Sequence, residues 1–180
     1  MLSIPSIRQT TDYTCGAAAL LSVLRYYGLY SGGELDLAKE LNTNKEWGTD
    51  PADIIKIAKK YCLRTTEHRH MTIKELLSVA SEGIPVIVAY QAWSDSDLDW
   101  RECWEDGHYS VVIGCDDNNI YFEDPSLEVG EVGYISKDEF LDRWHDIGSD
   151  YEPLYQYGIS LEGFSYSHND SVSHSLVKIE

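Results

Sequence analysis

Residues 109–123 read YSVVIGCDDNNIYFE, two runs of β-branched and aromatic residues separated by four turn-forming Asp and Asn residues. β-Branched and aromatic side chains favour strands, whereas Asp and Asn favour turns. The stretch therefore predicts an antiparallel hairpin, with strands over about 109–115 and 120–123. The turn register stays open, and a slip of one residue would move side chains to the opposite face. Further strands are expected at 85–90 (PVIVAY) and at about 155–161.

The chain before these strands is expected to be mainly helical. Helix-forming residues and helix-capping signals predict helices over about 16–27, 34–41, 51–61 and 73–82, and a shorter one after Ser136. Helices followed by an antiparallel sheet indicate an α+β fold. We expect one domain over residues 1–164, with a helical lobe at about 1–83 and a sheet lobe at about 84–164. A polar, frayed tail is expected over 165–180.

The composition and charge argue against nucleic-acid-binding, membrane and secreted proteins. The 180 residues hold 14 Lys and Arg against 31 Asp and Glu, a formal charge of −17. This charge repels phosphate backbones and anionic lipid surfaces, so nucleic acid is not expected as a partner. The apolar stretches have the length of strands, and neither a membrane span nor a secretory signal is predicted. We therefore expect a globular cytoplasmic protein.

Four cysteines occur without any Cys-x-x-Cys pair: Cys15, Cys62, Cys103 and Cys115. This spacing excludes a zinc ribbon and a thioredoxin-like site, and leaves each cysteine as a small buried side chain or a reactive thiol. Cys15 stands at the predicted start of an Ala-rich helix. The free N–H groups of a first helical turn stabilise a thiolate and could also hold an oxyanion.

Three other residues complete a possible hydrolytic site. Gln9 could donate its amide to an oxyanion formed by attack from Cys15, although it could also be an ordinary loop residue. His108, at the start of a predicted strand, is a candidate general base or a buried structural histidine. Asp124 could orient that imidazole, or simply begin an Asp-Pro turn. Together they would supply a nucleophile, a base, an orienting carboxylate and an oxyanion donor.

With these residues the chain resembles papain-like cysteine peptidases, and most closely the double-glycine leader peptidases that process bacteriocin precursors. The resemblance rests on Gln9, on CGAAAL from Cys15, on GHYSVVIG at 107–114 and on YFEDP at 121–125. It implies a two-lobed papain-like fold, with the nucleophile on the helical lobe and the His/Asp pair on the sheet lobe. Thr14 stands where that family commonly has Asp.

Three weaker features remain. The acidic segment 95–106 is either an exposed loop beside the cleft or the start of a calcium loop, and it could attract a basic substrate. His68 and His70 are a possible but incomplete metal pair. Trp93, Trp100 and Trp104 either line a binding groove or hold the acidic loop down.

The sequence thus predicts a cysteine hydrolase that needs no cofactor or metal and cleaves a peptide or protein substrate. Two alternatives stay open. One is a papain-like acyl transferase, which passes the acyl group to an amine or thiol instead of water. The other is a non-catalytic peptide-binding module.

Overall fold

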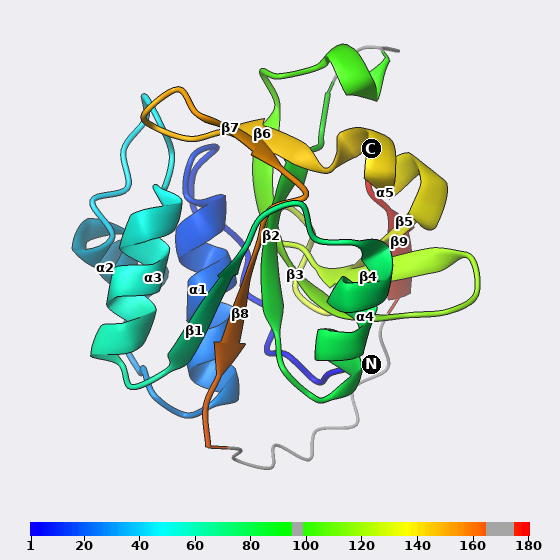
Figure 1. Ribbon diagram of the computed structural model, residues 1–180. Coiled ribbons are helices and arrows are strands. Elements are labelled where there is room, and N and C mark those ends of the chain that lie inside the picture. Colours follow the sequence, from blue (N-terminus) through cyan, green and yellow to red (C-terminus); the bar gives the residue numbers. More distant parts are fainter. Residues whose placement is uncertain (95–98, 165–174) are drawn as a thin grey trace.

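The computed structural model describes residues 1–94, 99–164 and 175–180 (Figure 1). Its helices are α1 (Cys15–Tyr26), α2 (Glu34–Glu40), α3 (Pro51–Lys60), α4 (Ile73–Ser81), the short 3-10 helix η1 (Trp100–Glu102) and α5 (Lys137–Arg143). Its strands are β1 (Arg64–His68), β2 (Val86–Gln91), β3 (Gly107–Cys115), β4 (Asn119–Glu123), β5 (Glu131–Ser136), β6 (His145–Ile147), β7 (Pro153–Tyr155), β8 (Gly158–Glu162) and β9 (Ser175–Lys178).

Seven strands form one sheet in the order β1-β8-β2-β3-β4-β5-β9, and β6 pairs with β7 in a separate two-stranded sheet. Neighbours in the large sheet are antiparallel except β5 and β9. Helices α1, α2 and α3 lie on one side of this sheet, and α4 and α5 lie on the other (Figure 1). The fold is therefore a mixed α+β structure built on a large antiparallel sheet, as the sequence predicted.

The helix-capping residues and the buried strand that the sequence predicts are present in the structure. Thr72 and Glu75 form the reciprocal capping box of α4, and Asp50 caps α3 by accepting a hydrogen bond from Ala52 N–H at 2.7 Å. Strand β2 is buried at every residue, as its uninterrupted apolar run indicates. Among the described residues, no helix is long and apolar enough to cross a bilayer.

Two expectations about organisation need correction. The segment 1–83 is mainly helical, as expected, but it does not form a separate helical lobe, because β1 pairs with β8 in the main sheet and α4 covers the face opposite α1. The tail was expected to be frayed, but Ser175–Lys178 forms strand β9, which pairs with β5 in the main sheet. Ile179 is fully buried there, and a Cβ on Gly133 would lie only 2.7 Å from it, so this glycine makes room for Ile179. Residues 165–174 lie outside the described ranges.

The predicted hairpin is present as β3 and β4, and its register contains an irregularity. Cys115 pairs with Ile120 and Gly114 with Tyr121, but Val112 pairs with Phe122. Strand β3 therefore carries one extra residue, Ile113, in a β-bulge. The bulged carbonyl is not left unpaired, because it accepts a hydrogen bond from Leu2 N–H at 2.6 Å.

This bulge decides which face of the sheet Asp124 occupies. Had the pairing near the turn continued without interruption, Asp124 would lie opposite Val111, on the face that packs against α1. With the extra residue, Glu123 pairs with Val111, and the next position along, Asp124, falls opposite Ser110. Side chains alternate along a strand, so Asp124 shares the face of Ser110 and His108.

Gly114, beside the bulge, offers a test of this geometry. Its φ is +158°, and a Cβ there would lie 3.1 Å from Met1 Cα. We expect Gly114→Ala to lower the free energy of unfolding by about 1–3 kcal/mol, because the backbone conformation and the close contact both disfavour a side chain. Urea unfolding measures this change. An unchanged free energy would mean that the bulge tolerates a side chain and does not depend on glycine.

Candidate active site

Cys15 is the first residue of α1, and its side chain is buried at the edge of a surface cleft. Thr14 precedes it but does not cap the helix, because its hydroxyl instead accepts a hydrogen bond from Thr11 N–H at 3.1 Å. The first helical bond runs from Ala18 N–H to Thr14 carbonyl oxygen. The N–H groups of residues 15–17 therefore precede the helical bonding pattern and no side chain caps them.

Gly16 explains how this helix end comes so close to its neighbours. A Cβ at Gly16 would lie 2.7 Å from Thr49 Cβ and 3.2 Å from the Tyr109 ring. Thr49 belongs to the loop before α3, and Tyr109 to β3. Glycine after Cys15 thus allows the start of α1 to pack directly against both walls of the cleft.

His108 and Asp124 form a buried pair on the sheet. His108 Nε2 lies 3.1 Å from both Oδ1 and Oδ2 of Asp124, and both side chains are almost fully buried. Asp124 also accepts hydrogen bonds from Ser110 hydroxyl at 2.8 Å, Tyr90 hydroxyl at 3.0 Å and Ser126 N–H at 2.8 Å. This network fixes the carboxylate, which in turn fixes the imidazole ring.

The same network sets the protonation of the pair. Burial alone would lower the pKa of His108, but the Asp124 carboxylate and its hydrogen bond, with a smaller contribution from Cys15, raise that pKa to about 10. Burial would raise the pKa of Asp124, yet His108 and the donors around the carboxylate lower it below its usual value. Both shifts favour the charged forms, an imidazolium beside a carboxylate. Since Nε2 faces Asp124, Nδ1 is the ring nitrogen left for Cys15.

Gln9 lies in the loop that leads to Cys15 and contacts the residues after Asp124. Its backbone N–H donates to Pro125 carbonyl oxygen at 2.8 Å, and its Oε1 accepts a hydrogen bond from Ser126 hydroxyl at 3.2 Å. Its Nε2 donates to Thr11 carbonyl oxygen at 2.7 Å. An amide has two N–H groups, so one remains for another acceptor. The structure thus ties Gln9 to both the Cys15 loop and the Asp124 loop.

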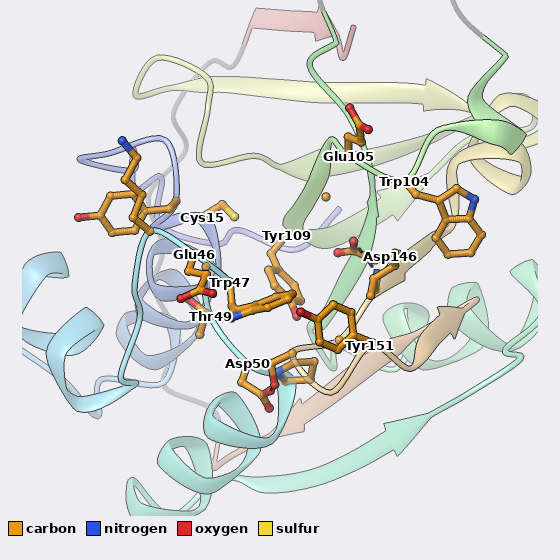
Figure 2. A pocket seen from close by; sticks show the side chains of 18 of the residues that line it. Cys15, Glu46, Trp47, Thr49, Asp50, Trp104, Glu105, Tyr109, Asp146 and Tyr151 are labelled. Carbon is orange, nitrogen blue, oxygen red and sulfur yellow. Dashed lines mark hydrogen bonds between the residues drawn. The ribbon is translucent and has the colours of Figure 1, made fainter.

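The cleft beside Cys15 has a volume of about 370 Å³ and is bounded by three loops (Figure 2). One contains Trp47 and precedes α3, another contains Trp104 and precedes β3, and a third contains Tyr151 and joins β6 to β7. The sequence did not point to Trp47, Asp146 or Tyr151. Trp47 and Tyr151 lie on loops and Asp146 lies on the short strand β6, and the positions of all three depend on contacts between distant segments.

Similarity to known proteins identifies the family. A family model described as the Peptidase C39 like family matches residues 1–152. The chain belongs to this C39-like peptidase family. An uncharacterised protein of Methanothermobacter marburgensis is 31% identical over 124 residues, covering 67% of this chain and 71% of that protein. The pediocin PA-1 transport/processing ATP-binding protein PedD of Pediococcus acidilactici is 26% identical over 149 residues, covering 83% of this chain but 18% of its own length.

Solved structures of C39 peptidases have the same fold. A protein described as a C39-like peptidase of Bacillus anthracis superposes with a TM-score of 0.69 and 22% identity, covering 91% of this chain and 96% of its own. A double-glycine-motif protease from an AMS/PCAT transporter, solved with its leader peptide, gives a TM-score of 0.63 at 20% identity, covering 90% and 93%. The fold is therefore that of the C39 peptidases.

The weaker sequence features lie outside this centre or at its edge. Part of the acidic segment, residues 95–98, lies outside the described ranges, and Asp99 binds Arg101. His68 lies 2.9 Å from Ser160 hydroxyl, and the described residues contain no group of three potential metal ligands. Of the three tryptophans, Trp104 lines the cleft, whereas the Trp100 ring lies under the Arg143 guanidinium at 3.7 Å.

Glu123, next to Asp124, gives a prediction about pH. Burial raises the pKa of Glu123 to about 7, although Ser6 hydroxyl and Ile7 N–H donate hydrogen bonds to it. The folded protein therefore holds a proton that the unfolded chain releases near pH 4.3, so this group favours folding at low pH and loses that effect as pH rises through 7. We expect Glu123→Gln to weaken the fall in stability between pH 4.5 and 6, measured by urea unfolding. An unaltered pH slope would contradict the assignment.

Proposed function

We propose that this C39-like protein is a peptidase that cleaves amide bonds through a Cys15 thiolate and a covalent acyl-enzyme. The observation that carries this proposal is the buried His108–Asp124 pair, whose free ring nitrogen is left for the Cys15 thiol at the start of α1. A positively charged imidazole beside a thiol favours the thiolate, which is the nucleophilic form.

The reaction would run in two steps. Cys15 sulfur attacks the peptide carbonyl carbon, and the oxyanion that forms lies against the free N–H groups of the α1 first turn, with Gln9 as a second donor. His108 gives its proton to the leaving amine as the C–N bond breaks, which leaves a thioester on Cys15. A water molecule then attacks the thioester, His108 takes a proton from that water, and the acid product leaves as the thiolate is restored.

The substrate we propose is a peptide or protein, including the leader segment of a precursor peptide. Two similarities support this choice. PedD is named as a transport and processing protein, and the transporter-derived protease was solved with a leader peptide. A water molecule as acceptor gives hydrolysis, whereas an amine or thiol as acceptor would give acyl transfer.

Chemical labelling tests the nucleophile without knowledge of the substrate. Cys15 is buried, whereas Cys62 and Cys115 are exposed. We nevertheless expect iodoacetamide at neutral pH to label Cys15 fastest, because labelling depends on the thiolate, and to label it more slowly in His108→Ala. Mass spectrometry of tryptic peptides identifies the labelled residue. Preferential labelling of a buried cysteine cannot result from accessibility, so the exposed cysteines serve as internal controls.

Peptide libraries then test the reaction. Cys15→Ala should remove cleavage entirely and leave the unfolding temperature close to that of the wild type; cleavage by this variant would refute the mechanism. Peptide binding without cleavage, together with slow labelling of Cys15, would instead identify a binding module. New amide products in the presence of an added amine would identify an acyl transferase.

Gln9 has a separate test. We expect Gln9→Ala to lower kcat by about 10²–10³-fold with a smaller effect on KM, because an oxyanion donor acts mainly in the transition state. Gln9→Glu has a similar shape but no amide donor, so it should show a comparable loss when kcat and KM are measured side by side. A loss confined to KM, or rescue by glutamate, would show that Gln9 has another role.

A further inference from the structure

One of the residues that line the cleft is a carboxylate that the proposed reaction does not use. Asp146 lies on β6, and its Oδ1 accepts hydrogen bonds from Ile147 N–H at 2.8 Å and Gln91 Nε2 at 3.3 Å. No described residue donates a hydrogen bond to its Oδ2. A Cβ on Gly107 would lie 2.4 Å from Asp146 Oδ1, so the carboxylate rests against the backbone that leads directly into His108. Asp146 is thus adjacent to the reacting groups.

The charge of this carboxylate is poorly balanced. Burial raises the pKa of Asp146 to about 7, more than its two hydrogen-bond donors and the charge of His108 lower it. Among the described residues that line the cleft, Lys45 is the single Lys or Arg. The carboxylates that line it are Asp12, Glu46, Asp50, Glu105 and Asp146. A cation brought into the cleft would therefore be attracted to Asp146 and would favour its ionised form.

Aromatic side chains stand around the same space. Trp47 is 39% exposed and Tyr151 is 74% exposed, and their rings meet edge to face at a centroid distance of 4.9 Å. They come from two different loops, and Figure 2 shows both near Tyr109 and Asp146. Large exposed aromatic residues at a cleft are suited to hold the alkyl part of a long side chain and to attract its positive end.

We infer that this part of the cleft is a subsite for a lysine or arginine side chain of the peptide, and that Asp146 is the residue that selects it. The alkyl stem lies along Trp47 and Tyr151, and the cationic end reaches Oδ2 of Asp146. This inference rests on the proposed function, since it requires a peptide chain to lie beside Cys15. It specifies the chemistry of one substrate residue close to the bond that is cleaved.

The test compares peptides that differ by one charge. Each pair carries lysine or norleucine, the neutral residue of the same alkyl chain, at one position within three residues of the cleaved bond. We expect one position at which lysine raises kcat/KM by about tenfold or more in the wild type. In Asp146→Asn, which retains the shape and Oδ1, this ratio should fall close to one. The exposed carboxylate of Glu82 lies at the end of α4, and Glu82→Gln, which makes the same charge change, should leave the ratio unchanged.

The outcomes separate this inference from the proposed reaction. Equal cleavage of lysine and norleucine peptides at every position, or a lysine preference that survives in Asp146→Asn, would overturn the subsite. An equal loss of preference in Glu82→Gln would also overturn it, because the effect would then come from overall charge. Fluorescence polarisation of labelled peptides on Cys15→Ala measures binding alone. Lysine-selective binding without cleavage by the wild type would refute the proposed reaction and retain the subsite.

Discussion

Most of the site depends on one buried ion pair, His108 with Asp124, and the ion pair depends on one extra residue in β3. Burying a carboxylate costs several kcal/mol unless a partner charge and hydrogen bonds compensate it. Here His108 supplies the charge, and Ser110, Tyr90 and Ser126 supply hydrogen bonds. Without the bulge at Ile113, Asp124 would face the α1 side of the sheet, and this set of partners would be lost. The register of β3 and β4 therefore places Asp124 where His108 and the three hydrogen-bond donors can compensate its burial.

The position of Cys15, the other half of the site, depends on how the start of α1 packs against the sheet. Cys15 occupies the start of α1, the helix that is buried between the sheet and the helices α2 and α3. Gly16 lets that helix end approach Thr49 and Tyr109, and the Thr14 side chain bonds to its own loop instead of capping the helix. The helix start thus keeps free N–H groups where the cleft opens. A rigid core helix holds them in place, which suits a group that must not move during the reaction.

The sequence predicted these two halves because each has a local signal. Cys15 begins an Ala-rich helix, and His108 is the second residue of the β-branched strand that begins at Gly107. What a single sequence could not predict is the relation between them, since the bulge shifts the register by one residue and no turn motif reveals it. Strand β9 escaped prediction for a similar reason. Its role becomes visible only when Gly133 of β5 is seen to leave space for Ile179. The loop with Trp47 and the short strand β6 with Asp146 likewise depend on contacts between distant segments.

Asp124, Glu123 and Asp146 are three buried or partly buried carboxylates whose different surroundings shift their pKa values in different directions. Burial disfavours the ionised form of all three, yet only Asp124 has a facing cation and several donors, and its pKa is lowered. Glu123, one residue earlier, lies on the opposite face with fewer donors, and its pKa is raised. The pKa of Asp146 is also raised, and Asp146 is one of the residues that line the cleft. Asp124 therefore has its cation within the protein, and in the proposed reaction it orients His108. Among the described residues Asp146 has no such cation beside it, and this is the physical basis on which we assign it to substrate selection.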